Sequence, residues 1–114
     1  MSKEVLPSYG NDELRRRVVR AVFAAIDQVN EMLPYELHLG KDPATAILAE
    51  GSSLDSMGFV NLIAAVEEEV SRELGGSVSL VESSTDNRAR FATVHALVDH
   101  VLTIVKRGKQ GLSE

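Results

Sequence analysis

The sequence predicts an all-α protein, a small helical bundle joined by long loops. Two long stretches carry apolar residues at spacings of three and four, the pattern of a helix with one buried face. A shorter stretch near the carboxyl end repeats this pattern. With 114 residues the chain has the size of one domain with a single core. Aromatic residues make up only 4% and tryptophan is absent, so we expect a core of valine, leucine, isoleucine and alanine.

The first helix is expected from Asn11 to Leu33. Asn11 and Asp12 supply capping chemistry, and Pro34 ends the helix because the residue before a proline is pushed out of the helical conformation. The apolar stripe comprises Leu14, Val18, Val22, Ile26, Val29 and Leu33. We interpret the basic cluster on this helix as a solvated face that favours solubility; it consists of Arg15, Arg16, Arg17 and Arg20.

A long connection over residues 34–54 separates this helix from the next. It is rich in proline and glycine, and long connections in compact domains usually carry function or lie against the surface. Within it, residues 44–50 are expected to form a turn or two of helix, with Ile47 and Leu48 reaching the core.

The second long helix is expected to begin at Ser56 and to stop at Gly75. Its buried face comprises Phe59, Leu62, Ile63, Val66, Val70 and Leu74. Residues 77–81 then alternate like an extended segment and residues 82–90 are polar, which leaves two alternatives for this stretch, a mobile segment or a short third helix.

The last helix is expected to start with Thr93 as its N-cap and to end near Lys106. It buries Val94, Leu97, Val98, Val101 and Val105. The domain is therefore expected to span residues 11–107, between a flexible tail at 1–10 and a short tail at 108–114.

Composition excludes several classes of function. The net charge of −5 argues against nucleic-acid binding and favours basic protein partners. Without cysteine there is no disulfide, thiolate metal site or cysteine nucleophile. His95 and His100 are five residues apart, which does not suit a shared metal, and both are expected at the surface. No apolar signal region and no run of about 18 apolar residues is present, so we expect a soluble, cytoplasmic monomer.

The chemically informative stretch lies around Ser56, at the start of the second helix. With Asp55 as N-cap, its carboxylate is expected to accept a hydrogen bond from the Gly58 N–H, and the Ser56 hydroxyl projects outward. A phosphodiester attached there would lie at the positive end of the helix dipole, which contributes about 0.3–1 kcal/mol at an exposed site.

A catalytic role for Ser56 is disfavoured because a serine nucleophile needs a base and an orienting acid within reach. None of the three histidines stands in a recognisable catalytic context, and the G-x-S-x-G motif is missing. We therefore expect Ser56 to be the substrate of a modifying enzyme, and we expect the chain itself to catalyse no reaction.

The stretch Leu54-Asp55-Ser56-Met57-Gly58, with the helix that follows it, resembles the D-S-L attachment motif and second helix of acyl carrier proteins. Residues 90–94 are similar to the junction before the last helix of that family. The resemblance covers roughly residues 11 to 106. It implies a four-helix carrier fold in which a phosphopantetheinyl transferase attaches 4′-phosphopantetheine from coenzyme A to Ser56.

The resemblance further implies that the thiol of this arm carries acyl groups as thioesters. Enzymes that load and transfer acyl groups, in fatty-acid, polyketide or specialised biosynthesis, would be the other partners. Two alternatives stay open: an aminoacyl or peptidyl carrier with the same arm, and a helical adaptor that is never modified.

Three departures from the family pattern point to a specialised carrier. Ser52 and Ser53 replace the usual leucine-glycine pair, and Asn61 stands where an acidic residue is common. The connection over residues 75–92 is also longer than in the compact fatty-acid carriers.

The second helix is also expected to dock partner enzymes. This surface comprises Met57, Val60, Asn61, Glu67 and Glu68, to which Glu69 adds negative charge. The other interpretation of the glutamates is a solvated face in which Glu68 pairs with Arg72 for about 0.2–0.5 kcal/mol. Phe59 and Phe91 are either plain core residues or the border of a cavity that shelters an acyl chain.

Overall fold

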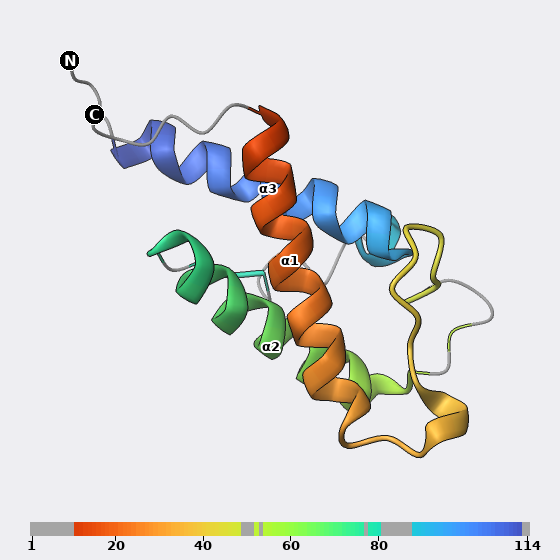
Figure 1. The fold of residues 1–114 in the computed structure, drawn as a ribbon. Helices are drawn as coiled ribbons and strands as arrows, with labels where there is room; N and C mark the ends of the chain where they lie inside the picture. Colours follow the sequence, from red (N-terminus) through yellow and green to blue (C-terminus); the bar gives the residue numbers. More distant parts are fainter. Residues whose placement is uncertain (1–10, 49–51, 53, 77, 81–87, 113–114) are drawn as a thin grey trace.

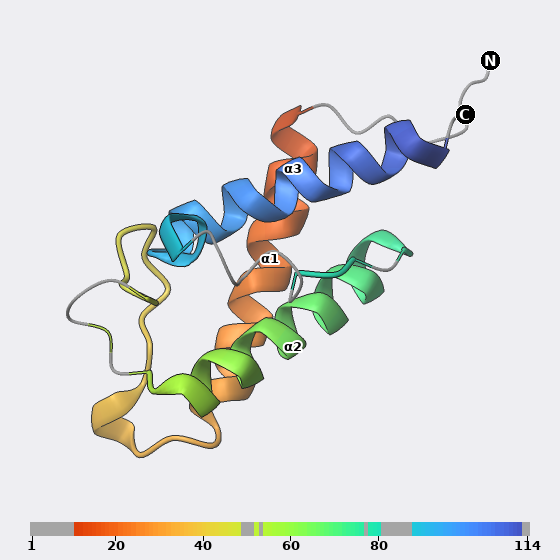
Figure 2. The ribbon, with the colours of Figure 1, turned by 180° about the vertical axis from the view of Figure 1, so that it is seen from behind.

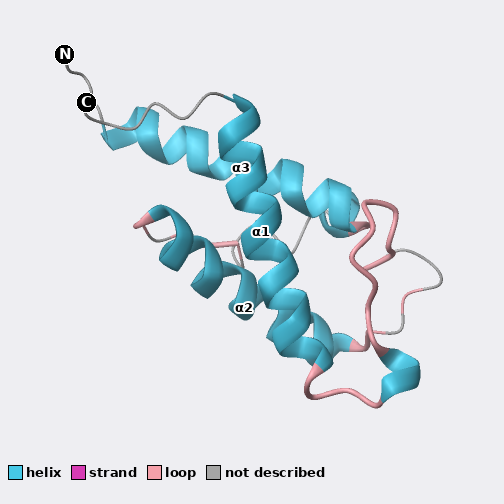
Figure 3. Cartoon of the chain, viewed as in Figure 1, coloured by secondary structure: helices cyan, strands magenta, loops and turns pink. Residues whose placement is uncertain are grey.

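The computed structural model describes residues 11–48, 52, 54–76, 78–80 and 88–112 (Figure 1). Within them the chain forms helices and loops and no strand, as Figure 3 shows. The helices are α1 (Asn11–Asn30), η2 (Tyr35–Leu37), α2 (Ser56–Leu74), η4 (Arg88–Phe91) and α3 (Val94–Leu112), where η2 and η4 are single 3-10 turns. The all-α prediction is confirmed. The described residues contain three α-helices rather than four.

Helix α1 buries the predicted apolar stripe against the rest of the molecule. Val18, Val22 and Ile26 are each fully buried, and Ala21 and Ala25 fill the same face. The helix ends at Asn30, three residues before the predicted end, and the Leu33 N–H donates to the Asn30 carbonyl (3.1 Å) in a tighter turn. A tight last turn of this kind is common where a helix must stop, here before Pro34.

Helix α1 packs antiparallel to α2, and the ion pairs between them set the register. Glu73 of α2 accepts from Arg17 (3.3 Å) and Arg20 (3.1 Å). Gln28, nearer the carboxyl end of α1, donates to Glu69, which lies one turn before Glu73 in α2. Arg15 pairs with Asp99 of α3. The interpretation of the arginine cluster as a merely solvated face is therefore corrected, because three of its four members hold other helices.

The expected helix over residues 44–50 is absent from its described part, residues 44–48. Ala46 instead forms an isolated antiparallel bridge with Thr93, and the Ile47 N–H donates to the Ala92 carbonyl (2.7 Å). The backbone finds its partners beside the start of α3 and has no need of helical bonds. Ile47 is buried and Leu48 partly buried, as predicted.

The described part of the connection after α2 folds back onto that helix. Leu80 is fully buried, and its N–H donates to the Glu67 carboxylate. Residues 81–87 lie outside the described residues, as does the expected tail at 1–10, so neither alternative for residues 82–90 is decided there. Directly after them, residues 88–91 form the 3-10 turn η4.

Three rings link α2, η4 and α3 edge to face. Phe91 meets Phe59 with ring centroids 5.5 Å apart and meets His100 at 5.1 Å. Phe91 is fully buried, which favours the interpretation of both phenylalanines as core residues. His100 is only 4% exposed, so its expected surface position is wrong: the ring of Phe91 covers it. His95 is exposed, as expected, and contacts Asp99.

Helix α3 begins as predicted, with the Thr93 hydroxyl accepting from the Ala96 N–H (3.1 Å). It continues to Leu112, beyond the expected end near Lys106. Gly108 does not stop it, since a single glycine costs a helix only about 0.5–1 kcal/mol relative to alanine. Figure 2 shows α3 crossing in front of α1, on the side of α1 where α2 also lies. No helix in the described part of the chain combines the length and apolarity needed to cross a bilayer.

We predict that Phe91→Ala lowers the free energy of unfolding by about 3–5 kcal/mol, because it removes a fully buried ring from the contact between three elements. Tyr35→Ala is the matched control: its ring is 85% exposed, so the change should stay within about 0.5 kcal/mol. Urea denaturation followed by circular dichroism measures both. Equal effects of the two substitutions would contradict this account of the core.

Candidate functional site

Ser56 is the first residue of α2 and its side chain is exposed. The helix begins there because Asp55 is extended (φ −91°, ψ −174°) and its Oδ1 accepts from the Gly58 N–H at 2.7 Å. The Phe59 N–H then donates to the Asp55 carbonyl (2.9 Å), the first bond of the helix. The predicted N-cap and the outward position of Ser56 are both confirmed.

Gly58 allows the residues before the helix to fold back against its first turn. A Cβ at this position would lie 2.8 Å from the Leu54 Cδ2 and 3.2 Å from the Asp55 Oδ1. Leu54 is partly buried against the core, and its N–H donates to the Ser52 hydroxyl (3.1 Å). Sequence reasoning missed this role of Gly58, whereas the hydrogen bond to Ser52 agrees with the expectation that Ser52 and Ser53 are loop or capping residues rather than attachment points. The available signal was a glycine inside the first helical turn, where helix propensity disfavours it.

The electrostatic setting of Ser56 favours an anion. An α-helix leaves its first four N–H groups without an intrahelical acceptor, and only one of these, that of Gly58, is used by the Asp55 cap. These amides and the helix dipole make the end of α2 electropositive at short range. An anionic group attached to the Ser56 hydroxyl would therefore lie where the backbone stabilises it.

No acid–base partner for Ser56 is found in the described part of the molecule. The His38 ring lies against Tyr35 and makes a hydrogen bond to the Leu33 carbonyl (3.0 Å). His95 contacts Asp99 on α3, and His100 is buried behind Phe91. Neither does any group of three or more potential metal ligands occur among the described residues. Each of the three histidine rings is thus engaged by residues other than Ser56.

The structure divides the predicted docking residues into two groups. Met57 (69% exposed), Val60 (58% exposed) and Asn61 stand in solvent on the first turns of α2. Glu68 is exposed too and pairs with Arg72 at 3.2 Å, as the solvated-face interpretation proposed. Glu67 differs because its carboxylate holds the Leu80 N–H, which gives it a structural task.

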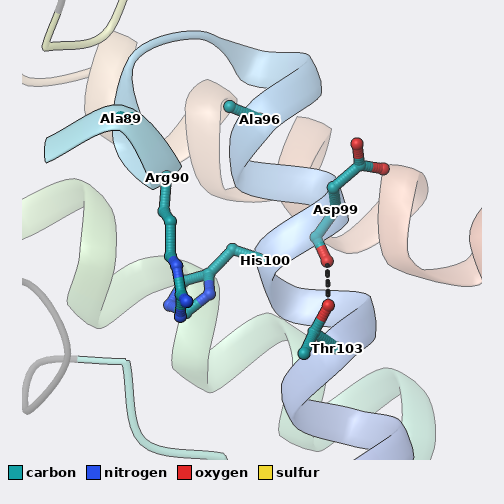
Figure 4. Close-up of a pocket in the computed structure, with 6 residues that line it drawn as sticks. All are labelled: Ala89, Arg90, Ala96, Asp99, His100 and Thr103. Atoms are coloured by element: carbon teal, nitrogen blue, oxygen red, sulfur yellow. Dashed lines mark hydrogen bonds between the residues drawn. The ribbon is translucent and has the colours of Figure 1, made fainter. Parts of the chain in front are cut away.

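A surface hollow of about 330 Å³ lies away from Ser56, between η4 and α3. Figure 4 shows the Arg90 side chain running to the His100 ring, while the Asp99 carboxylate points away from them. The Thr103 hydroxyl is used as a donor to the Asp99 carbonyl (3.1 Å). Arg90 and His100 bring basic nitrogen atoms to the hollow, and the Asp99 carboxylate is engaged by Arg15 and His95.

Comparison of the chain with family models, with curated proteins and with solved structures gave no match. Its function is therefore inferred from Ser56 and the residues around it.

We predict that Asp55→Ala lowers the free energy of unfolding by about 1 kcal/mol, within the range of about 0.5–2 kcal/mol typical of a lost N-cap, because the Gly58 N–H loses its acceptor. Asp55→Asn keeps an amide oxygen at the same place and should retain most of the stability. Chemical denaturation distinguishes the two. If the alanine variant unfolded at the same denaturant concentration as the unchanged protein, the cap would contribute nothing.

Proposed function

We propose that this chain is a carrier protein of the acyl carrier type, with Ser56 as the attachment point of a 4′-phosphopantetheine arm. The observation that carries the proposal is an exposed serine at the first position of a capped helix, in the sequence Asp55-Ser56-Met57, where the Asp55 carboxylate is engaged as the cap and no described histidine is assigned to the serine. A hydroxyl in this position is reachable by a second protein and is not prepared for catalysis by its own chain.

The attachment chemistry makes one bond and breaks one. The Ser56 oxygen attacks the phosphorus of coenzyme A that bears the pantetheine, and the bond of this phosphorus to the adenosine phosphate breaks. The hydroxyl proton passes to a base of the phosphopantetheinyl transferase, and adenosine 3′,5′-bisphosphate leaves. The protein contributes an accessible nucleophilic oxygen and a helix end that stabilises the new phosphodiester by about 0.3–1 kcal/mol.

The arm supplies a terminal thiol that holds acyl groups as thioesters. The described residues fit such a group, because the Ser56 side chain faces solvent and the side chains beside it, Asp55 and Met57, are exposed as well. A weak hold on the phosphodiester suits a carrier, since the arm must reach the active sites of several enzymes in turn. The helical bundle then provides a stable attachment point for the arm, and the reactions of the acyl group take place in the active sites of the partner enzymes.

The distribution of charge supports basic partners at this end of the molecule. Residues 21–71 contain nine carboxylates and a single basic residue, Lys41, which pairs with Asp27 at 2.7 Å. The other 11 of the 12 lysines and arginines lie outside this range. A protein with such a polarity is oriented by the field of a basic partner before contact, and this raises the rate of productive encounters.

We predict that incubation with coenzyme A and a broad-specificity phosphopantetheinyl transferase adds the mass of one phosphopantetheine group, and that Ser56→Ala abolishes the addition. Ser52→Ala is the control and should be modified normally. Mass spectrometry measures the increment, and circular dichroism checks that the helical content of each variant is retained.

Two results would contradict the proposal. An unmodified chain would indicate a helical adaptor, and a modified Ser56→Ala variant would place the attachment point elsewhere. If the increment is found, mass spectrometry of protein from its native cell distinguishes an acyl carrier from an aminoacyl or peptidyl carrier by the mass of the load.

A further inference from the structure

The exposed large apolar side chains of the described residues occur in two short segments only. One segment directly follows α1 and the other forms the first turns of α2. The first contributes Met32 (63% exposed), Tyr35 (85%) and Leu37 (40%), and the second contributes Met57 (69%) and Val60 (58%). Single exposed apolar residues need no explanation, but a concentration of this kind marks a site of contact with another molecule.

The antiparallel register brings the two segments to the same end of the bundle. Arg20 of α1 contacts Glu73 of α2, and Gln28, eight residues later in α1, contacts Glu69, four residues earlier in α2. Later residues of α1 therefore lie beside earlier residues of α2. The residues that follow α1 therefore lie toward the first turns of α2. Figures 1 and 2 show η2 and the beginning of α2 together at this end.

The first segment is held in place, although its apolar side chains face solvent. Asn30 makes two hydrogen bonds to the backbone of Leu39, at 2.7 and 3.0 Å, and so closes the loop that contains η2. The ring of Tyr35 rests against His38, and the Leu37 N–H donates to the Pro34 carbonyl (2.8 Å). A loop ordered in advance loses little conformational entropy when it binds.

Negative charge borders this apolar surface. Glu31 and Glu36 are exposed beside the first segment, and Asp55 is exposed beside the second. Lys41, the one basic residue in this part of the chain, is engaged by Asp27. A complementary partner therefore has an apolar contact surface bordered by lysine or arginine. A second copy of this chain would bring like charges together, which opposes self-association.

We propose that the phosphopantetheinyl transferase that modifies Ser56 binds both segments at once, and that Met32 and Tyr35 provide a second contact that determines how well this chain is selected as its substrate. The inference rests on the proposed function, which makes Ser56 the substrate. Tyrosine is among the residues that most often dominate binding energy at protein interfaces, and Tyr35 has almost its whole ring available.

The test is a kinetic comparison of the full-length chain with its Met32→Ser/Tyr35→Ser double variant and its Tyr35→Ser single variant. The substrate is coenzyme A and the enzyme is the phosphopantetheinyl transferase of the same organism. For the double variant we expect KM for the carrier to rise about tenfold, with kcat unchanged, because loss of one of the few side chains that dominate an interface costs at least this factor. Thr103→Ala on α3 is the control and should leave both constants unchanged.

The charged border has its own matched pair of variants. Glu36→Gln and Asp12→Asn change the net charge equally, but only Glu36 lies at the proposed surface. We expect Glu36→Gln to raise KM about two- to threefold and to weaken its dependence on salt, and Asp12→Asn to do neither.

Three results would overturn the inference. An unchanged KM in the double variant, with full modification at saturating enzyme, would remove Met32 and Tyr35 from the interface and leave Ser56 as the attachment point. A wild-type dimer that the double variant converts to monomers in sedimentation equilibrium would identify a second copy as the occupant. A wild-type chain that the transferase never modifies would reject the proposed function and this inference with it.

Discussion

The antiparallel contact between α1 and α2 is the constraint on which the rest of the molecule depends. Branched side chains make up much of the buried faces of the two helices, among them Val18 and Val22 of α1 and Leu62, Val66 and Val70 of α2. Polar interactions along the edge of this contact select one register of the two helices, since apolar packing alone would allow several. These interactions run from Arg17 and Arg20 to Glu73 and from Gln28 to Glu69. Because of this register, the start of α2 lies beside the loop that leaves α1, and the acidic and apolar residues of both segments are exposed at one end.

At the start of α2, the residues around Ser56 determine its exposure and its hydrogen-bonding environment. The Asp55 carboxylate caps the helix by accepting a hydrogen bond from the Gly58 N–H. Ser56, the first helical residue, is exposed to solvent. Gly58 gives the room in which Leu54 and the Asp55 carboxylate fit against the first turn. Among the described residues the hydroxyl is exposed and no histidine is assigned to it, a combination that fits the modification site proposed above. In the function we propose, the site depends on partners for its chemistry, and the exposed apolar and acidic side chains of the same end are the surface proposed to bind them.

The contacts of Phe91 and of residues 45–48 stabilise the position of α3. Phe91 of η4 stands between Phe59 and His100 and so connects α2 to α3 through a short turn. Residues 45–48 attach to the start of α3 by backbone hydrogen bonds, with Ile47 in the core. A 3-10 turn and a loop segment thus hold α3 against the other helices.

The sequence by itself determined the elements that depend on local chemistry. Helical periodicity identified α1, α2 and α3; Asp55 and Thr93 marked two of their starts; and the outward position of Ser56, Met57 and Val60 followed from the buried face opposite them. The tertiary structure decided what depends on contacts between distant residues. In the folded chain, arginines of α1 pair with Glu73 and Asp99. Residues 44–48 bond to the segment before α3 and do not form a helix. His100 is buried beside Phe91, and the Glu67 carboxylate accepts from the Leu80 N–H. The physical reason is that the period of a helix and its cap depend only on residues close together in the sequence. The hydrogen-bonded and ionic partners named above are between 13 and 84 positions apart, and the contact of His100 with Phe91 forms only when the elements pack.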